Sequence, residues 1–167
     1  AVSMALNSKF PKCVVWGPNL TSIYNDAFRP ILGNKPPALG RSFREVWHEV
    51  WDEIDPIAQR AYAGEATFIE DFPLVIDRFG YPEKAHFTFC YSPLRDNDGV
   101  VRGMMDTVIE TTGKIEAQKQ SRLLNRELEH RIKNTLAVVS AIVHQTLRSF
   151  TSDIRMRDTL MQRISSL

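Results

Sequence analysis

The sequence has few cysteines, no long apolar run and no stretch typical of a signal peptide. Its two cysteines, Cys13 and Cys90, lack the CxxC spacing of metal and redox motifs, and two isolated thiols argue against a disulfide framework. No apolar stretch approaches the roughly 18 residues that a membrane span requires. The N-terminal AVSMALNSKFPKC is too short and too polar for a signal peptide. We therefore expect a cytoplasmic protein that does not enter a membrane.

Motifs that bind nucleotide phosphates are missing as well. The sequence contains neither GxxxxGK[ST] nor GxGxxG, and phosphoryl transfer from ATP needs backbone groups that hold the phosphates together with Mg²⁺ ligands. No carboxylate pair or catalytic triad stands out, which disfavours a small enzyme that works through an internal pocket. A function of this chain that depends on ATP would therefore need a further domain.

Composition and charge indicate a globular chain with two different parts. Hydrophobic residues make up 43% and charged residues 25% of the 167 residues, as in ordinary globular domains. The net charge is +1, but residues 114–167 carry ten Lys/Arg against five Asp/Glu, a local charge of +5, and residues 1–113 carry −4. We expect these two parts to have different roles.

Residues 10–110 have the pattern of a mixed α and β domain. Between the second and third predicted strands, SFREVWHEVWDEI and PIAQRAYAG predict short helices, with Ser42 as an N-cap, Pro56 in a first helical turn and Gly64 as a C-terminal stop. The Asp98-Gly99 step favours a β-hairpin. Hairpin-linked strands around a helical insert predict an α+β fold, a five-stranded antiparallel sheet with helices on one face. The predicted strands are KCVVWG, SIYNDAF, ATFIEDFPLVIDR, EKAHFTFCYSPLRD and VVRGMMDTVIET.

The order and spacing of four segments resemble a PAS sensor domain. These segments are WGPNLTSIYNDAFRPILG, PALGRSFREVW, HFTFCYSPLRD and VIETT. The resemblance covers about residues 10–112 and implies a PAS domain over residues 1–112, with residues 1–9 as the tail of a leading helix. In such a domain a change in the core alters the last strand. Glu110 and Thr111 would then form the joint that passes the signal to the following helix.

We expect no cofactor in this fragment. A flavin-binding photosensor of the LOV class carries a cysteine in an asparagine-cysteine-arginine run, whereas the corresponding segment here reads PALGRSFREVW. Haem ligation by His48 or His86 is disfavoured, because His48 lies in a predicted amphipathic helix and His86 alternates with phenylalanines along a predicted strand. The aromatic residues of the domain are expected to pack in the core or on the sheet.

After Thr112 the sequence becomes helical. No Pro or Gly occurs from Lys114 to Phe150, which predicts one helix of about 35 residues, near 50 Å long. A second helix is predicted within TSDIRMRDTLMQRISSL, so residues 113–167 would form a linker helix and a truncated dimerisation and phosphotransfer hairpin. A helix this long with an apolar seam needs a partner. The seam consists of Leu124, Leu128, Ile132, Leu136, Val139, Val143 and Leu147.

His130 is predicted to lie on the side of this helix opposite the seam. It is two residues from the nearest seam positions on either side, which places it about 160 to 200° away from them. Lys133, Asn134 and Glu127 share its outward face. Geometry alone leaves three interpretations open, namely a solvated surface histidine, a phosphoacceptor or a metal ligand.

The segment around His130 carries a second resemblance. ELEHRIKNTLAVVSAI resembles the phosphoacceptor helix of bacterial sensor histidine kinases of the HWE type and of the related family that shares the H-R-x-K-N box, here His130-Arg131-x-Lys133-Asn134. The resemblance implies that His130 is phosphorylated from ATP and Mg²⁺ held by a separate domain, which this fragment lacks. It also implies a homodimer through the helical hairpin, and a receiver domain of a response regulator whose aspartate takes the phosphoryl group.

Charged neighbours of His130 are candidates for supporting roles. In the more common histidine kinases an acidic residue directly follows the phosphorylated histidine and serves as a hydrogen-bonding base, whereas Arg131 follows here. Glu127 or Glu129 is a candidate to orient the imidazole, and Arg131 and Lys133 are candidates to offset the developing phosphate charge. Ordinary solvated helix charges are the alternative for all four.

The sequence as a whole predicts the sensory and phosphoacceptor part of a two-component protein histidine kinase, inactive as a fragment. The alternative is a non-catalytic module, a PAS domain with a basic dimerisation helix that binds protein or nucleic acid. The local charge of +5 favours nucleic acid. Acidic residues interrupt the basic ones, however, and no single basic stripe forms, so we expect no nucleic-acid partner.

Overall fold

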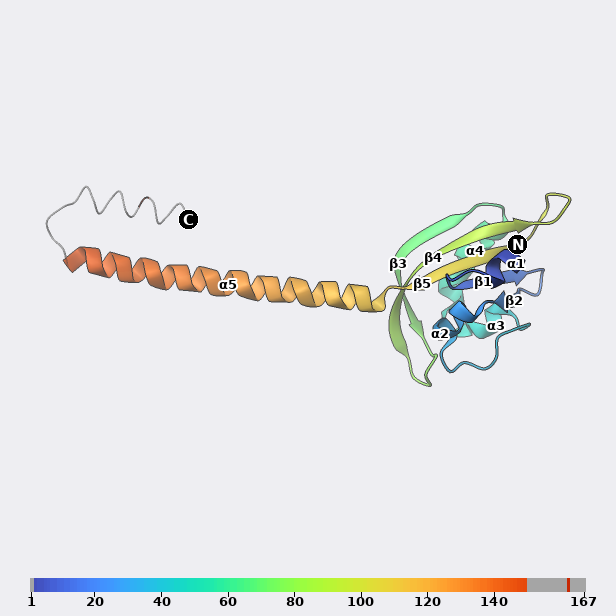
Figure 1. Ribbon diagram of the computed structural model, residues 1–167, viewed down its shortest axis with the longest axis horizontal. Helices are drawn as coiled ribbons and strands as arrows, with labels where there is room; N and C mark the ends of the chain where they lie inside the picture. The colour runs from blue at the N-terminus through green and yellow to red at the C-terminus, as the bar shows by residue number, and fades with distance from the viewer. Residues whose placement is uncertain (1, 150–161, 163–167) are drawn as a thin grey trace. The chain divides into compact units, whose positions relative to one another are not determined.

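The computed structural model describes residues 2–149 and residue 162 (Figure 1). Two compact units divide the chain, residues 1–116 and residues 117–167. The first unit contains a sheet with short helices. Helix α5 (Thr112–Ser149) begins in the first unit and supplies most of what is described of the second.

The first unit is built on one antiparallel sheet of five strands in the order β2-β1-β5-β4-β3, so the N-terminal strand β1 pairs with the last strand β5. The hairpin predicted at Asp98-Gly99 joins β4 to β5, and Gly99 has a φ of +80°, which glycine adopts without steric cost. The α+β prediction with five strands is confirmed. The strands are β1 (Lys12–Trp16), β2 (Thr21–Tyr24), β3 (Thr67–Ile76), β4 (Glu83–Arg95) and β5 (Val101–Glu110).

Short helical segments precede the sheet and follow its second strand. They are α1 (Val2–Leu6), α2 (Arg29–Leu32), α3 (Phe43–Val46) and α4 (Trp51–Tyr62), with 3-10 turns at Asp26–Phe28 and His48–Val50. The predicted helix SFREVWHEVWDEI is therefore three pieces, because the chain leaves the α-helical conformation at Trp47, whose φ and ψ are −113° and 32°.

Asn25 ends the second strand earlier than the pattern SIYNDAF predicts. β2 stops at Tyr24, and the Asn25 side chain accepts a hydrogen bond from the Phe28 backbone N–H at 3.2 Å, which caps a 3-10 turn. The same amide donates through Nδ2 to the carbonyl oxygens of Ala5 and Ser8, at 3.1 and 2.9 Å. One buried side chain thus fixes the leading segment against the turn after β2.

Pro56 lies inside α4 and not in a first helical turn as predicted. It is the sixth residue of α4, where its missing N–H leaves the Asp52 carbonyl without a helical hydrogen bond. Burial of Trp51, Ile54 and other apolar side chains of α4 outweighs this loss. The helix stops near the predicted residue, because Gly64 has a φ of +95° just beyond its end.

The core lies between the sheet and the helices of the insert. Alternate residues of β4 face it, and Ala85, Phe87, Phe89 and Tyr91 are all buried. The Phe43 ring of α3 packs edge to face on Tyr91, with 6.3 Å between the ring centroids. The predicted packing of these strand aromatics in the core is therefore observed.

Helix α5 is uninterrupted over 38 residues, close to the predicted length. The seam residues Leu124, Leu128, Ile132, Leu136 and Val139 are 44–58% exposed, so the described part of the chain leaves this stripe uncovered. The side chain of Leu147 lies outside the described residues. The predicted second helical arm does as well, except for Gln162.

Candidate phosphoacceptor site

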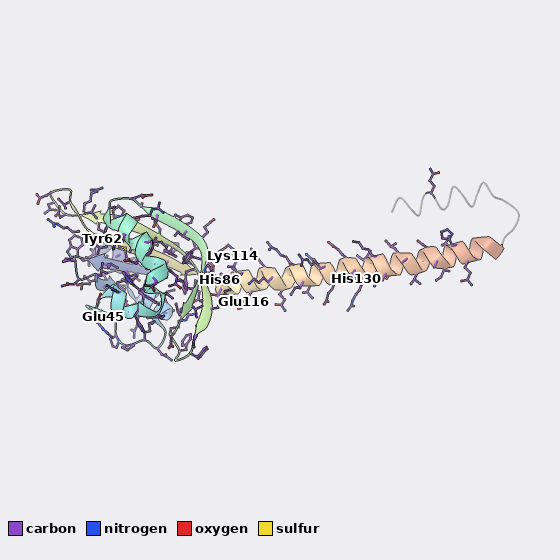
Figure 2. All side chains as sticks on the ribbon, turned by 180° about the vertical axis from the view of Figure 1, so that it is seen from behind. Glu45, Tyr62, His86, Lys114, Glu116 and His130 are labelled. Carbon is purple, nitrogen blue, oxygen red and sulfur yellow. The ribbon has the colours of Figure 1, made fainter. Side chains whose placement is uncertain are left out.

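Helix α5 presents His130 to solvent. Its side chain is exposed, as are those of the turns before and after it, and Figure 2 shows His130 in the middle of the helix. Each of these residues belongs to a helix without Pro or Gly after Gly113, so the helical spacing of the H-R-x-K-N box is undisturbed. An incoming domain can reach the imidazole without unfolding any described element.

Asn134 contacts the imidazole directly. Its Nδ2 atom lies 3.3 Å from Nδ1 of His130, one helical turn further along α5. Within the described part of the chain, Asn134 is the only side chain that hydrogen-bonds to His130. The outer ring nitrogen, Nε2, has no hydrogen bond from any described residue.

The charged residues of the predicted site surround His130 without touching it. Glu127, Glu129, Arg131 and Lys133 are all exposed on α5, and none forms a hydrogen bond or ion pair with His130 among the described residues. Their side chains are free to meet an incoming phosphate or protein. Their roles in orientation and charge compensation stay predictions.

The predicted joint at the end of β5 is held by an ion pair. Glu110 accepts two hydrogen bonds from the Arg78 guanidinium, at 2.7 and 2.9 Å, and Arg78 also bonds to Glu83 at 3.0 Å. The Arg78 side chain is only 6% exposed. Hydrogen bonding to Arg78 lowers the pKa of Glu110 below its ordinary value, and the two carboxylates raise the pKa of Arg78.

Hydrogen bonds to β4 fix the first residues after the joint. The Thr111 backbone N–H donates to the carbonyl oxygen of His86 at 2.8 Å, and the His86 N–H donates to Oγ1 of Thr112 at 2.9 Å. The sequence prediction named Glu110 and Thr111 but missed Arg78, His86 and Thr112. These residues are far apart in the sequence, and they meet at the end of β5 only because β4 lies between β3 and β5 in the sheet.

A row of polar residues crosses the inward face of the sheet. Tyr24, Cys13, Asp106, Tyr91 and Thr67 are successive register partners on β2, β1, β5, β4 and β3. Burial raises the pKa of the Cys13 thiol and of the Tyr91 hydroxyl. Cys13, Asp106, Tyr91 and Thr67 are buried, and Tyr24 at one end of the row is partly buried.

Asp106 lies at the centre of this row and faces a small cavity. It is 4% exposed, and its Oδ1 atom has no hydrogen-bond partner among the described residues. Burial raises its pKa well above the ordinary value of an aspartate, because desolvation disfavours the charged form. The cavity measures about 40 Å³, and aromatic and aliphatic side chains such as Phe43, Trp47 and Ile54 line most of it. No motif or pattern around Asp106 marks it as a buried residue in the sequence.

Two further features are absent from the described residues. No cluster of three or more His, Cys, Asp or Glu side chains there has the arrangement to hold a metal ion. No helix there combines the length and the apolar character needed to cross a membrane.

Comparison with known proteins gives a family match for the segment that contains His130. Residues 127–167 match the family described as HWE histidine kinase, and the match includes His130 and the whole H-R-x-K-N box. The chain is also 33% identical over 64 residues to a blue-light-activated histidine kinase of Brucella anthropi. That alignment covers 38% of this chain and 13% of the relative, so this chain corresponds to a small part of the relative's length.

Solved structures assign the fold of the part that precedes the HWE segment. The PAS domain of Bordetella pertussis BvgS superposes with a TM-score of 0.51 at 16% identity, over 75% of this chain and 93% of that chain. An RNA-binding light-oxygen-voltage receptor superposes with a TM-score of 0.51 at 20% identity, over 77% of this chain and 36% of that chain. Identities this low establish the fold alone. The chain thus joins a domain of PAS-type fold to a segment that matches the HWE histidine kinase family.

Proposed function

We propose that this chain is the sensory and phosphoacceptor part of a cytoplasmic two-component histidine kinase. In this proposal, input to the PAS domain controls ATP-dependent phosphorylation of His130, and an aspartate of a response regulator then takes the phosphoryl group. The observation that carries the proposal is the exposed His130 within the H-R-x-K-N box of the matched residues 127–167. A neutral imidazole nitrogen is nucleophilic near pH 7, and exposure lets two different domains reach the same atom in turn.

ATP and Mg²⁺ would be held elsewhere in the kinase. The sequence contains no phosphate-binding loop of the GxxxxGK[ST] or GxGxxG type, and phosphoryl transfer depends on such a site. The fragment by itself is therefore expected to have no kinase activity. Arg131 and Lys133, which are exposed beside His130, are suited to meet the charge of the incoming phosphates.

A homodimer through α5 is part of the proposal. The stripe of exposed Leu and Ile side chains along one face of the helix supports it, because a long isolated helix in water is marginally stable and gains most from burying such a face. His130, on the other face, would remain accessible in such a dimer.

The joint offers a route from the sensor to the helix. The Arg78–Glu110 ion pair ties the end of β5 to the connection between β3 and β4, and hydrogen bonds with the His86 backbone tie Thr111 and Thr112 to β4. A change in the core that moves β4 or β5 would therefore act directly on the first residues of α5. We propose that this is how the input reaches the helix.

We further propose that the PAS domain of this fragment works without a bound chromophore. Its core cavity of about 40 Å³ supports this, because pockets for cofactor-sized ligands measure roughly 300–1,000 Å³. A visible absorption band in the purified protein would contradict the proposal.

The test of the proposed function is His130→Gln in the full-length kinase. We expect complete loss of acid-labile phosphorylation from ATP, because glutamine lacks a nucleophilic ring nitrogen, while the dimer mass stays unchanged. His144→Gln is the matched control, since His144 is an exposed histidine of the same helix outside the box. Label retained in the first variant, or lost only in the control, would rule out His130 as the phosphoacceptor.

The basic character of residues 114–167 keeps a nucleic-acid-binding module as the second candidate. Their local charge of +5 would attract a phosphate backbone, and such binding would weaken steeply with salt. His130→Gln separates the two functions, because it removes the proposed phosphoacceptor and leaves every Lys and Arg of the helix in place.

A further inference from the structure

A surface pocket lies beside helix α2, outside the core of the domain. It measures about 340 Å³, whereas the core cavity measures about 40 Å³. Pockets that bind small molecules occupy roughly 300–1,000 Å³. Most of the lining residues are exposed, so the pocket opens to solvent. The apolar part of the lining consists of Tyr24, Leu32, Pro36, Pro37 and Leu39.

Two unpaired charges of opposite sign also line this pocket. Asp26 and Arg29 lie three residues apart in consecutive helical segments, which makes their side chains neighbours. Neither side chain forms a hydrogen bond or an ion pair with a described residue. The third charge, on Lys35, is already matched, because its Nζ atom lies 2.6 Å from Oε1 of Glu49 and 5.1 Å from the centroid of the Trp47 ring. The pocket therefore offers one cation and one anion and has no net charge.

We propose that this pocket binds a free amino acid with an apolar side chain, and that its occupancy is an input to the joint. The second part rests on the proposed function, whereas the binding itself does not. The Arg29 guanidinium can hold an α-carboxylate with two parallel hydrogen bonds. The Asp26 carboxylate can accept hydrogen bonds from the α-ammonium group, and the apolar lining can cover the side chain. A simple anion or a simple cation would leave one of the two charges unmatched.

The segment that forms the pocket is packed against the ion pair at the joint. A Cβ atom on Gly33, a lining residue, would lie 2.9 Å from the carbonyl oxygen of Arg78. The Asn34 N–H donates to that oxygen at 2.8 Å, and Nη1 of Arg78 lies 3.5 Å from the carbonyl oxygen of Pro30. The Arg78 guanidinium in turn holds Glu110 at the end of β5. A ligand that moves α2 or the loop after it would therefore act on the residue that anchors the joint.

Binding is tested on the 167-residue chain without any ATP-binding domain. The probe is L-leucine at millimolar concentration, and we expect it to shift the backbone amide resonances of residues 24–39 in NMR spectra. Isocaproate lacks the ammonium group of leucine, and isoamylamine lacks the carboxylate. Each should bind roughly 10- to 100-fold more weakly than leucine, because each loses one charge-assisted pair. Leucine that shifts no amide of this segment, or that binds no better than either fragment, would overturn the inference.

Two substitutions assign the two charges. Arg29→Gln should remove the preference for leucine over isoamylamine, because the carboxylate then meets no cation. Asp26→Asn should remove the preference for leucine over isocaproate. Arg44→Gln is the matched control, the same change at an exposed arginine outside the pocket, and should bind leucine as the wild type does. Preferences that survive in both pocket variants would overturn the inference.

The input is tested in the full-length kinase. We expect leucine to change the rate of His130 phosphorylation by roughly fivefold or more, the usual size of a coupling between two sites. The change should occur in the wild type and in Arg44→Gln but not in Arg29→Gln. A wild-type rate that does not respond to leucine would overturn the inference that the pocket is an input. Absence of any label on His130 would instead refute the proposed function, and the binding measurements would stand.

Discussion

The PAS domain and helix α5 both separate apolar from charged side chains, but they differ in what covers the apolar face. In the domain, the inward residues of β4 and the apolar face of α4 bury one another. In α5, the stripe that contains Leu128 and Ile132 stays exposed. Each Å² of apolar surface that stays in water forgoes about 25 cal/mol of stabilisation. The domain therefore has a core of its own, whereas α5 would gain stability from any apolar surface that covered its stripe.

The largest effect should come from a charge on the exposed stripe. We expect Ile132→Asp to weaken dimerisation of the chain by more than about 100-fold, because two buried isoleucines are lost per dimer and a carboxylate enters each copy of the seam. The helical circular dichroism should fall at the same time, since unpaired helices fray. Sedimentation over a range of protein concentrations measures the first effect.

Lys119→Asp is the control for this change. It places the same carboxylate on α5 at an exposed position away from the stripe, so the dimer should persist. The unfolding of the PAS domain should be the same in both variants. A dimer that withstands Ile132→Asp would show that the exposed stripe of α5 is not the subunit contact.

The two regions also differ in how far the sequence predicted them. The period of α5 and the absence of Pro and Gly fixed its length and its seam, because a helix is determined by residues close in the chain. In the domain, the strands were found, but Asn25 ended one early and Pro56 was tolerated inside α4, since tertiary packing overrode the local preference. The local pattern thus predicts best where few distant contacts compete.

The residues of the candidate sites also differ in whether the sequence predicted them. His130 and Asn134 were identified as one box, because both lie within two turns of a helix. Arg78 was missed as the partner of Glu110, 32 residues away in the chain, because nothing in its own surroundings marks it. Asp106 was missed for a related reason, since an aspartate among strand residues reads as surface until the register places it in the core.

Arg78→Met should destabilise the domain and leave the helicity of α5 unchanged. We expect a loss of about 3 kcal/mol in the free energy of unfolding, because Glu83 and Glu110 lose the guanidinium that pairs them. The loss should be at the low end of the usual range, since these carboxylates are 27% and 30% exposed. Urea unfolding followed by tryptophan fluorescence measures it, as the three tryptophans all lie in the domain.

Arg60→Met is the matched control for this substitution. It removes the same guanidinium from an exposed ion pair with Glu65, so the loss of stability should be much smaller than for Arg78→Met. If the two variants lose equal stability, burial of the Arg78 pair contributes nothing, and the joint is held by its backbone hydrogen bonds alone.

The smallest effect concerns two carboxyls on the same strand with opposite shifts. Arg78 lowers the pKa of Glu110, so its contribution to stability is present above the pKa of the unfolded chain and is lost as the pH falls through the folded pKa. Burial raises the pKa of Asp106, and the sign reverses. Above about pH 4 the unfolded chain releases the Asp106 proton while the folded domain keeps it, so rising pH destabilises the fold.

Asp106→Asn isolates the contribution of Asp106 to the pH dependence of stability, because the amide has nearly the same shape as the carboxyl and does not titrate. Between pH 5 and 7, the wild type should lose up to about 1.4 kcal/mol per pH unit relative to the variant, for as long as folded Asp106 stays protonated. The difference between the two unfolding curves cancels the histidines and the other carboxyls, which both proteins share. Parallel pH profiles would mean that Asp106 ionises alike in both states, and hence that water reaches its carboxyl through the small cavity. The core of the domain would then admit water, although its apolar side chains are buried and those of the α5 stripe are not.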